Sequence, residues 1–152
     1  RNAVLRGRLD WRTGPLTLSA SGFGIAARSD YDGLDPLTFL RADTADLSRN
    51  RLAAGRLGGR FEQDGWTVAL GLSRLGSRNR NLLGSAEQNR TSGRRDTLTL
   101  EAARAFTAIG FDHRLTLAGE WSGERFRASD TAYGGSTNQR RSRDQSALTA
   151  EY

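Results

Sequence analysis

The sequence predicts an all-β chain, an antiparallel up-and-down meander that is a partial transmembrane β-barrel, about seven strands of a larger barrel. Three observations predict this fold class: apolar and polar residues alternate with a period of two, tight-turn sequences join the alternating runs in pairs, and long polar segments separate the pairs. The sequence has no run of about 18 apolar residues, which a membrane-spanning helix needs. Transmembrane strands need no such run, because their side chains alternate between lipid and lumen.

Alternation defines the expected strands in order. They are residues 3–12, 16–26, 51–62, 66–72, 95–106, 114–122 and a last run that begins near 145. The first two flank Gly14 and Pro15, the next two flank Asp64 and Gly65, and the fifth and sixth flank residues 107–110. Asp-Gly between two alternating runs is a strong hairpin signal. Aromatic rings flank every short turn, as at the interfacial girdles of membrane barrels: Trp11, Phe61, Trp66, Phe106 and Phe111.

Long polar segments separate the predicted hairpins, at residues 27–50, 76–94 and 127–144. All three far exceed the usual connection of about 4–6 residues, so we expect them to be loops. Short turns that alternate with long loops are typical of outer-membrane barrels, whose periplasmic turns are short and whose extracellular loops are long.

Composition excludes several classes of site. The chain has no cysteine, which removes disulfides, thiolate metal sites and cysteine nucleophiles. All 23 basic residues are arginine and the net charge is +6, which suggests nucleic-acid binding, but the arginines are spread along the chain without a dense basic helix. The only histidine, His113, has no nucleophile-elbow serine to work with, so we expect no enzyme activity. A chain that begins with Arg1 and Asn2 is expected to be a portion of a longer polypeptide.

Two segments resemble TonB-dependent outer-membrane receptors, and the cobalamin-transporter type is the nearest likeness. They are the loop 29–36 (Ser-Asp-Tyr-Asp-Gly-Leu-Asp-Pro) and the strand 113–126 (His-Arg-Leu-Thr-Leu-Ala-Gly-Glu-Trp-Ser-Gly-Glu-Arg-Phe), which is followed later by a strand that ends in Ala150, Glu151 and Tyr152. The resemblance implies that residues 1–152 are a middle portion of a 22-stranded receptor barrel domain. The plug domain and the remaining strands would be absent from this segment.

The resemblance also implies a function and a location. Such a receptor lies in the Gram-negative outer membrane, binds a scarce nutrient of the cobalamin or metal-chelate class at its extracellular loops, and transports it into the periplasm. The implied partners are membrane lipid, the small-molecule nutrient and, through the absent plug, the energy-transducing TonB complex. Nucleic acid is not an expected partner.

Carboxylates gather on the first long polar segment. Asp30, Asp32 and Asp35, with Asp43 and Asp46 further on, supply the oxygen ligands that hard cations such as calcium prefer. The resemblance adds that cobalamin-type receptors can bind calcium with loop aspartates, and Asp32 matches that region best. We therefore expect a candidate Ca²⁺ site at Asp30, Asp32 and Asp35, with a solvated loop as the alternative. No cofactor is required.

Charged residues within the predicted strands are expected to face a water-filled lumen. The candidates are Arg56, Arg60, Arg114 and Glu120. The arginines would contact the plug or guide an anionic ligand. In a soluble β-sandwich the same residues would form the solvent face.

Two other functions fit the pattern. One is a small self-contained outer-membrane barrel, and the other is a soluble arginine-rich β domain that binds nucleic acid. Open edge strands and a lipid-facing apolar surface predict that the isolated chain aggregates in water without detergent.

Overall fold

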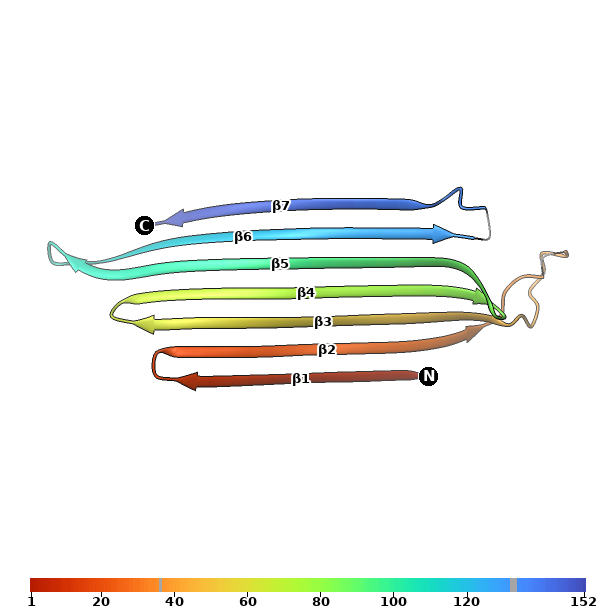
Figure 1. The fold of residues 1–152 in the computed structure, drawn as a ribbon, viewed down its shortest axis with the longest axis horizontal. Helices are drawn as coiled ribbons and strands as arrows, with labels where there is room; N and C mark the ends of the chain where they lie inside the picture. Colours follow the sequence, from red (N-terminus) through yellow and green to blue (C-terminus); the bar gives the residue numbers. More distant parts are fainter. Residues whose placement is uncertain (36, 132–133) are drawn as a thin grey trace.

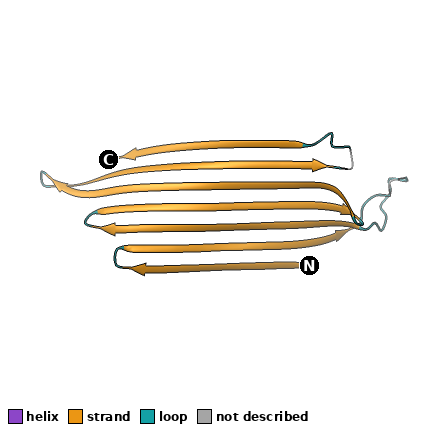
Figure 2. Ribbon diagram, in the orientation of Figure 1, coloured by secondary structure: helices purple, strands orange, loops and turns teal. Residues whose placement is uncertain are grey.

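The computed structural model describes residues 1–35, 37–131 and 134–152. Within this part of the chain, seven strands form one open antiparallel sheet in sequence order (Figure 1, Figure 2). The strands are β1 (Asn2–Thr13), β2 (Leu16–Tyr31), β3 (Asp46–Gln63), β4 (Trp66–Leu83), β5 (Ala86–Ala108), β6 (Phe111–Asp130) and β7 (Gln139–Glu151). Each strand pairs with the next along the chain, which confirms the predicted all-β meander.

Backbone conformation in the two-residue turns sets the strand pairing. In the β3–β4 turn, Asp64 has φ 51° and Gly65 has φ 76°, so both central residues are left-handed, as in a type I′ turn. The twist of such a turn matches the right-handed twist of its flanking strands. Ile109 and Gly110 close the β5–β6 hairpin in the same way, with φ 53° and 76°.

The predicted loop at residues 76–94 is wrong. β4 continues to Leu83, a two-residue turn follows in which Gly84 has φ 61°, and β5 begins at Ala86. Both faces carry polar side chains in this stretch, so the sequence shows no apolar alternation. The strands form nevertheless, because pairing uses the backbone N–H and C=O groups, which every residue here has. The other two predicted loops are shorter than expected, because strands extend into them and leave connections of 32–45 and 131–138.

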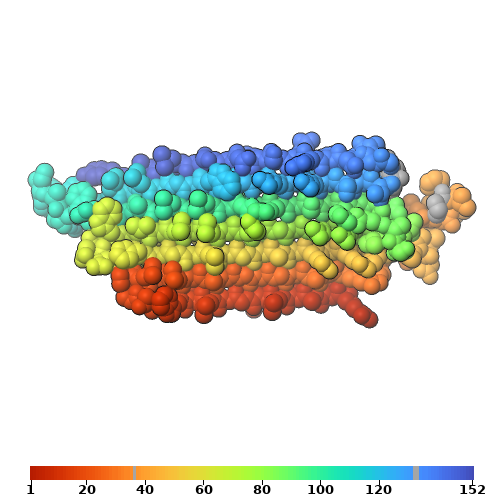
Figure 3. All heavy atoms as spheres, in the orientation of Figure 1, coloured from red at the N-terminus to blue at the C-terminus, as the bar shows by residue number. Residues whose placement is uncertain are grey.

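Few side chains are buried in this single-layered structure. Among the described residues, the buried ones are Gly71 and three with side chains, Leu47, Ala103 and Ser122, which expose 6%, 3% and 3% of their surface. Figure 3 shows every strand uncovered along its length on one face. Backbone pairing therefore holds the sheet together without a conventional hydrophobic core, and the surroundings of its two faces become the functional question.

Substitution of two turn glycines separates backbone strain from steric contact. Gly65→Ala and Gly110→Ala introduce the same left-handed alanine, since both positions have φ 76°. A Cβ at Gly65 meets the Ala105 carbonyl oxygen at 2.5 Å, whereas nothing lies within 4 Å at Gly110. We expect G110A to lower the free energy of unfolding by about 1 kcal/mol and G65A to lower it by a further 1–3 kcal/mol or so. Urea unfolding followed by tryptophan fluorescence measures both, and equal losses would contradict the steric contribution.

Candidate functional site

Register sorts the side chains of the sheet into two chemically different faces, because residues directly opposite each other on neighbouring strands point the same way. One continuous row across the sheet is Trp11, Leu18, Gly59, Leu70, Leu100, Gly119 and Leu148. We call this side the leucine face. The other side, which we call the hydroxyl face, carries Ser19, Ser21, Ser73, Thr97, Thr99, Thr116, Ser122 and Thr149.

Aromatic rings collect on the leucine face at the end of the sheet that carries the short turns. The Arg104 guanidinium lies 4.8 Å from the ring centroid of Trp66. His113 stacks between Phe106 and Tyr152, with ring centroids 5.2 Å and 5.7 Å away. Its Nδ1 also lies 2.6 Å from the Tyr152 hydroxyl oxygen. These contacts place His113 in an aromatic cluster on the surface of the sheet.

Arginines dominate the opposite end of the leucine face. In the described part of the chain eleven of them lie there, which we call the arginine belt: Arg28, Arg49, Arg51, Arg74, Arg78, Arg80, Arg90, Arg94, Arg125, Arg127 and Arg140. Many are directly opposite one another across neighbouring strands, as Arg51 is to Arg78 and Arg127 to Arg140. Like charges in such positions repel, so the belt is electrostatically unfavourable unless anions neutralise it.

Carboxylates neutralise only part of the belt. Asp96 accepts hydrogen bonds from Nε of Arg74 and Nε of Arg94, both at 2.6 Å. Glu87 lies 2.7 Å from Arg90 and 3.6 Å from Arg80. Arg28 pairs with Asp30. Within the described residues, six belt arginines form no ion pair: Arg49, Arg51, Arg78, Arg125, Arg127 and Arg140.

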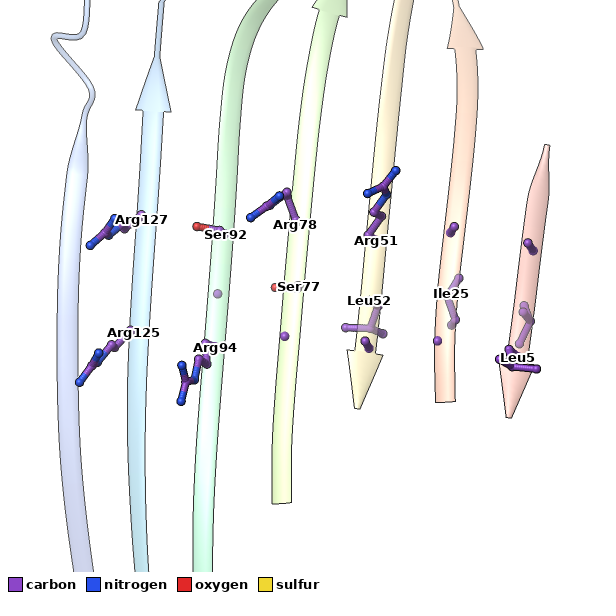
Figure 4. A pocket seen from close by; sticks show the side chains of 17 residues that line it. Leu5, Ile25, Arg51, Leu52, Ser77, Arg78, Ser92, Arg94, Arg125 and Arg127 are labelled. Atoms are coloured by element: carbon purple, nitrogen blue, oxygen red, sulfur yellow. The ribbon is translucent and has the colours of Figure 1, made fainter. Parts of the chain in front are cut away.

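A trough of about 760 Å³ crosses the sheet where the belt meets the apolar surface. Its floor is made of small residues, among them Gly24, Ala53 and Gly76, and Leu5 lies on its apolar side. Figure 4 shows the basic side chains around it, which come from four neighbouring strands: Arg51, Arg78, Arg94, Arg125 and Arg127. The trough therefore places an apolar surface next to guanidinium groups, and all of those named except Arg94 form no ion pair within the described residues.

The belt was not predicted from the sequence, although a signal for it is present. Arginines two residues apart point to the same face of a strand, and this spacing occurs at Arg49 and Arg51, at Arg78 and Arg80, and at Arg125 and Arg127. Distribution along the chain conceals the cluster, because pairing brings Arg49 opposite Arg80, 31 positions later.

All four predicted lumen-facing residues lie on the hydroxyl face. Arg56, Arg60 and Glu120 line one shallow hollow of about 450 Å³, and Arg114 lines a neighbouring one. Arg60 also pairs with Glu62 at 2.7 Å. The structure thus brings three of the four together, and whether this side is a lumen stays a prediction.

The three predicted calcium ligands have separate surroundings. Asp30 lies within β2 and pairs with Arg28 at 3.1 Å. Asp35 accepts hydrogen bonds from the backbone N–H groups of Leu37 and Thr38, which lower the pKa of its carboxyl. Asp32 lies in the connection 32–45. Among the residues that the structure describes, no group of three or more His, Cys, Asp or Glu is arranged to hold a metal ion. The calcium site stays an untested prediction, and Pro36, the end of the quoted loop motif, lies outside the described residues.

No known family, curated protein or solved structure matches this chain. In the described residues no helix is long and apolar enough to cross a membrane.

The stability of the turn at Asp35 should depend on pH. Because hydrogen bonds lower the folded-state pKa of Asp35, its carboxylate stabilises the turn above the ordinary aspartate pKa of about 4, and this contribution is lost as the pH falls through the folded-state value. We expect Asp35→Ala to speed hydrogen exchange at the Leu37 and Thr38 amides, and Asp35→Asn, which keeps an acceptor, to do so less. NMR exchange measures both. Equal exchange in all three proteins would show that the Asp35 side chain does not hold the turn.

Proposed function

We propose that the chain forms part of the wall of an outer-membrane β-barrel, with the leucine face toward lipid and the hydroxyl face toward a water-filled lumen. The observation that carries this proposal is the shape of the apolar band on the leucine face. The band starts at the short turns and covers residues 16–26 of β2, 53–61 of β3, 98–108 of β5 and 111–121 of β6, and it is shorter on β4, at 66–72. Arg104, which stacks on Trp66, is the arginine inside it among the described residues. Tilted membrane strands need about 9–11 residues to cross the hydrocarbon.

The stagger of the short turns supports the same interpretation. The row that begins at Thr13 on β1 and passes through Leu16 on β2 reaches β5 at Ala102, yet β5 continues six residues further, to Ala108, before it turns. Six residues cover about 20 Å along a strand, and the four strand spacings from β1 to β5 cover about 19 Å. A line through the turns is therefore inclined to the strands by roughly 45°, close to the tilt of strands in membrane barrels.

Backbone pairing at the edges of the sheet also favours a larger assembly. Only one side of β1 and one side of β7 is paired within the described residues. In hydrocarbon every backbone N–H and C=O needs a partner, so further strands must close the barrel on both sides. In a receptor, the rest of a longer polypeptide would supply these strands. A small self-contained barrel would instead have to close with few or no strands from outside this segment.

For the class of barrel we propose an energy-coupled receptor, from the resemblance of residues 29–36 and 113–126 to TonB-dependent receptors. The end of the sheet opposite the aromatic turns would then face the outside, and the connection 32–45 would take part in capture of a nutrient of the cobalamin or metal-chelate class. Transport would also need the plug and the energy-transducing complex. The chain would supply binding and a passage, without covalent chemistry.

One observation favours a second candidate. The arginine belt is a two-dimensional cationic surface, which also suits a soluble β domain that binds nucleic acid. In that case a partner would have to cover the apolar band in water. A monodisperse chain in detergent-free buffer, with salt-sensitive binding to DNA, would support this candidate over the barrel.

Labels at adjacent residues test the orientation of the two faces. The chain has no cysteine, so Leu100→Cys and Thr99→Cys each provide one site for a nitroxide spin label. After the full chain is folded in phosphatidylcholine bilayers, we expect the label at position 100 to collide with dissolved oxygen, which concentrates in hydrocarbon. We expect the label at position 99 to collide with a water-soluble nickel chelate.

The two positions are matched controls, because they are neighbours on β5 and differ in the face to which they point. Power-saturation EPR measures both accessibilities. Equal access of the nickel chelate to both labels would overturn the membrane-wall proposal.

A further inference from the structure

The arginine belt begins where the apolar band ends, on one strand after another. The first belt arginines beyond the band are Arg28 on β2, Arg51 on β3, Arg74 on β4, Arg94 on β5, Arg125 on β6 and Arg140 on β7. On β2, β3 and β4 the arginine is the next residue on the same face after the band, as Arg74 is after Leu72. Asp96 separates Arg94 from the band on β5, Gly123 separates Arg125 from it on β6, and three polar residues separate Arg140 from it on β7. Basic side chains thus lie beyond the apolar surface on every strand from β2 to β7, and directly next to it on β2, β3 and β4.

The belt has too few anions of its own to pair with every arginine. Its eleven arginines share the leucine face with few carboxylates, and Asp30, Glu87 and Asp96 are the ones that pair with it among the described residues. The Nε atoms of Arg80 and Arg90 are buried without a hydrogen-bond partner in the same part of the chain. Direct opposition of Arg51 to Arg78 adds repulsion that an external anion would relieve.

The arrangement of the guanidinium groups indicates which kind of anion the belt would bind. Guanidinium groups bind phosphate through paired hydrogen bonds. Neighbouring strands are about 4.8 Å apart, and residues on one face recur about every 7 Å along a strand, so the belt is a two-dimensional array of donors. A layer of phosphates fits this array better than a single linear polyanion does.

The belt adjoins the apolar band, and this indicates what kind of molecule carries the phosphates. The trough has Leu5 and small residues on one side and Arg51, Arg78 and Arg125 on the other. A molecule that occupies it must present hydrocarbon and phosphate side by side. We propose that the arginine belt binds the headgroup phosphates of anionic lipids whose acyl chains cover the apolar band. This inference rests on the proposed function, and it adds the lipid class that the surface recognises.

Two matched double variants test the proposal. Arg125→Gln with Arg127→Gln removes two belt arginines from β6, and Arg141→Gln with Arg143→Gln removes two arginines at the same height of β7, on the hydroxyl face. The full chain, folded in zwitterionic micelles, is titrated with bisphosphorylated lipid A and with its dephosphorylated form, and tryptophan fluorescence reports binding. We expect the β6 variant to weaken binding of the phosphorylated lipid by roughly tenfold or more, and the β7 variant by less than about twofold.

A third variant probes the trough without a change of charge. Gly76 has open space where a Cβ would stand, so Gly76→Leu fills the floor of the trough while every arginine remains. We expect Gly76→Leu to weaken lipid binding as well, whereas the β7 double variant should still bind the lipid. Far-UV circular dichroism before each titration confirms that the strands are present.

Each contrary outcome overturns a different step. Equal binding of the phosphorylated and dephosphorylated lipids, or equal losses in the two double variants, would overturn the belt's role and leave the barrel intact. Binding of inorganic pyrophosphate as tight as that of the lipid would show a site for free phosphate. Arginine-dependent binding of a DNA oligonucleotide in detergent-free buffer, with equal nickel accessibility at positions 99 and 100, would overturn both the lipid site and the barrel.

Discussion

The face on which each side chain of this sheet lies depends on the register of backbone pairing. Because side chains alternate with a period of two, a slip of one residue in any hairpin would move every side chain beyond it to the other face. Leu70 and Leu72 would then join Thr99 on the hydroxyl face. Two-residue turns with left-handed residues such as Gly65 prevent such slips, and the one register shift in the β4–β5 pairing, between Asn81 and Leu82, lies beyond the apolar band.

A single layer with this register cannot stabilise itself as a globular domain does. Leu57, Leu72 and Leu98 line up across three strands, yet they keep 58%, 47% and 38% of their surface exposed. The free energy that apolar burial normally supplies must come from whatever covers the leucine face. In the proposed barrel that cover is lipid, which also explains why the hydroxyl face tolerates Arg56, Arg60 and Glu120: it would be the side that stays wet.

The belt and the band set opposite requirements on the same face. An apolar band excludes water, and a row of opposed arginines such as Arg49 and Arg80 needs counter-charge. Both requirements are met at a lipid headgroup layer, where hydrocarbon gives way to phosphate over a short distance.

Sequence alone determined the strands that alternate and the turns that join them. Residues 51–62 and 66–72 around Asp64 and Gly65 could be predicted because alternation and left-handed turn preference are local properties. It did not reveal that residues 76–94 continue the sheet, since polar residues on both faces leave no periodic signal while their backbones still pair. The arginine belt was decided only by tertiary structure, because cross-strand register brings Arg51 opposite Arg78 and Arg94 opposite Arg125 from positions far apart in the chain.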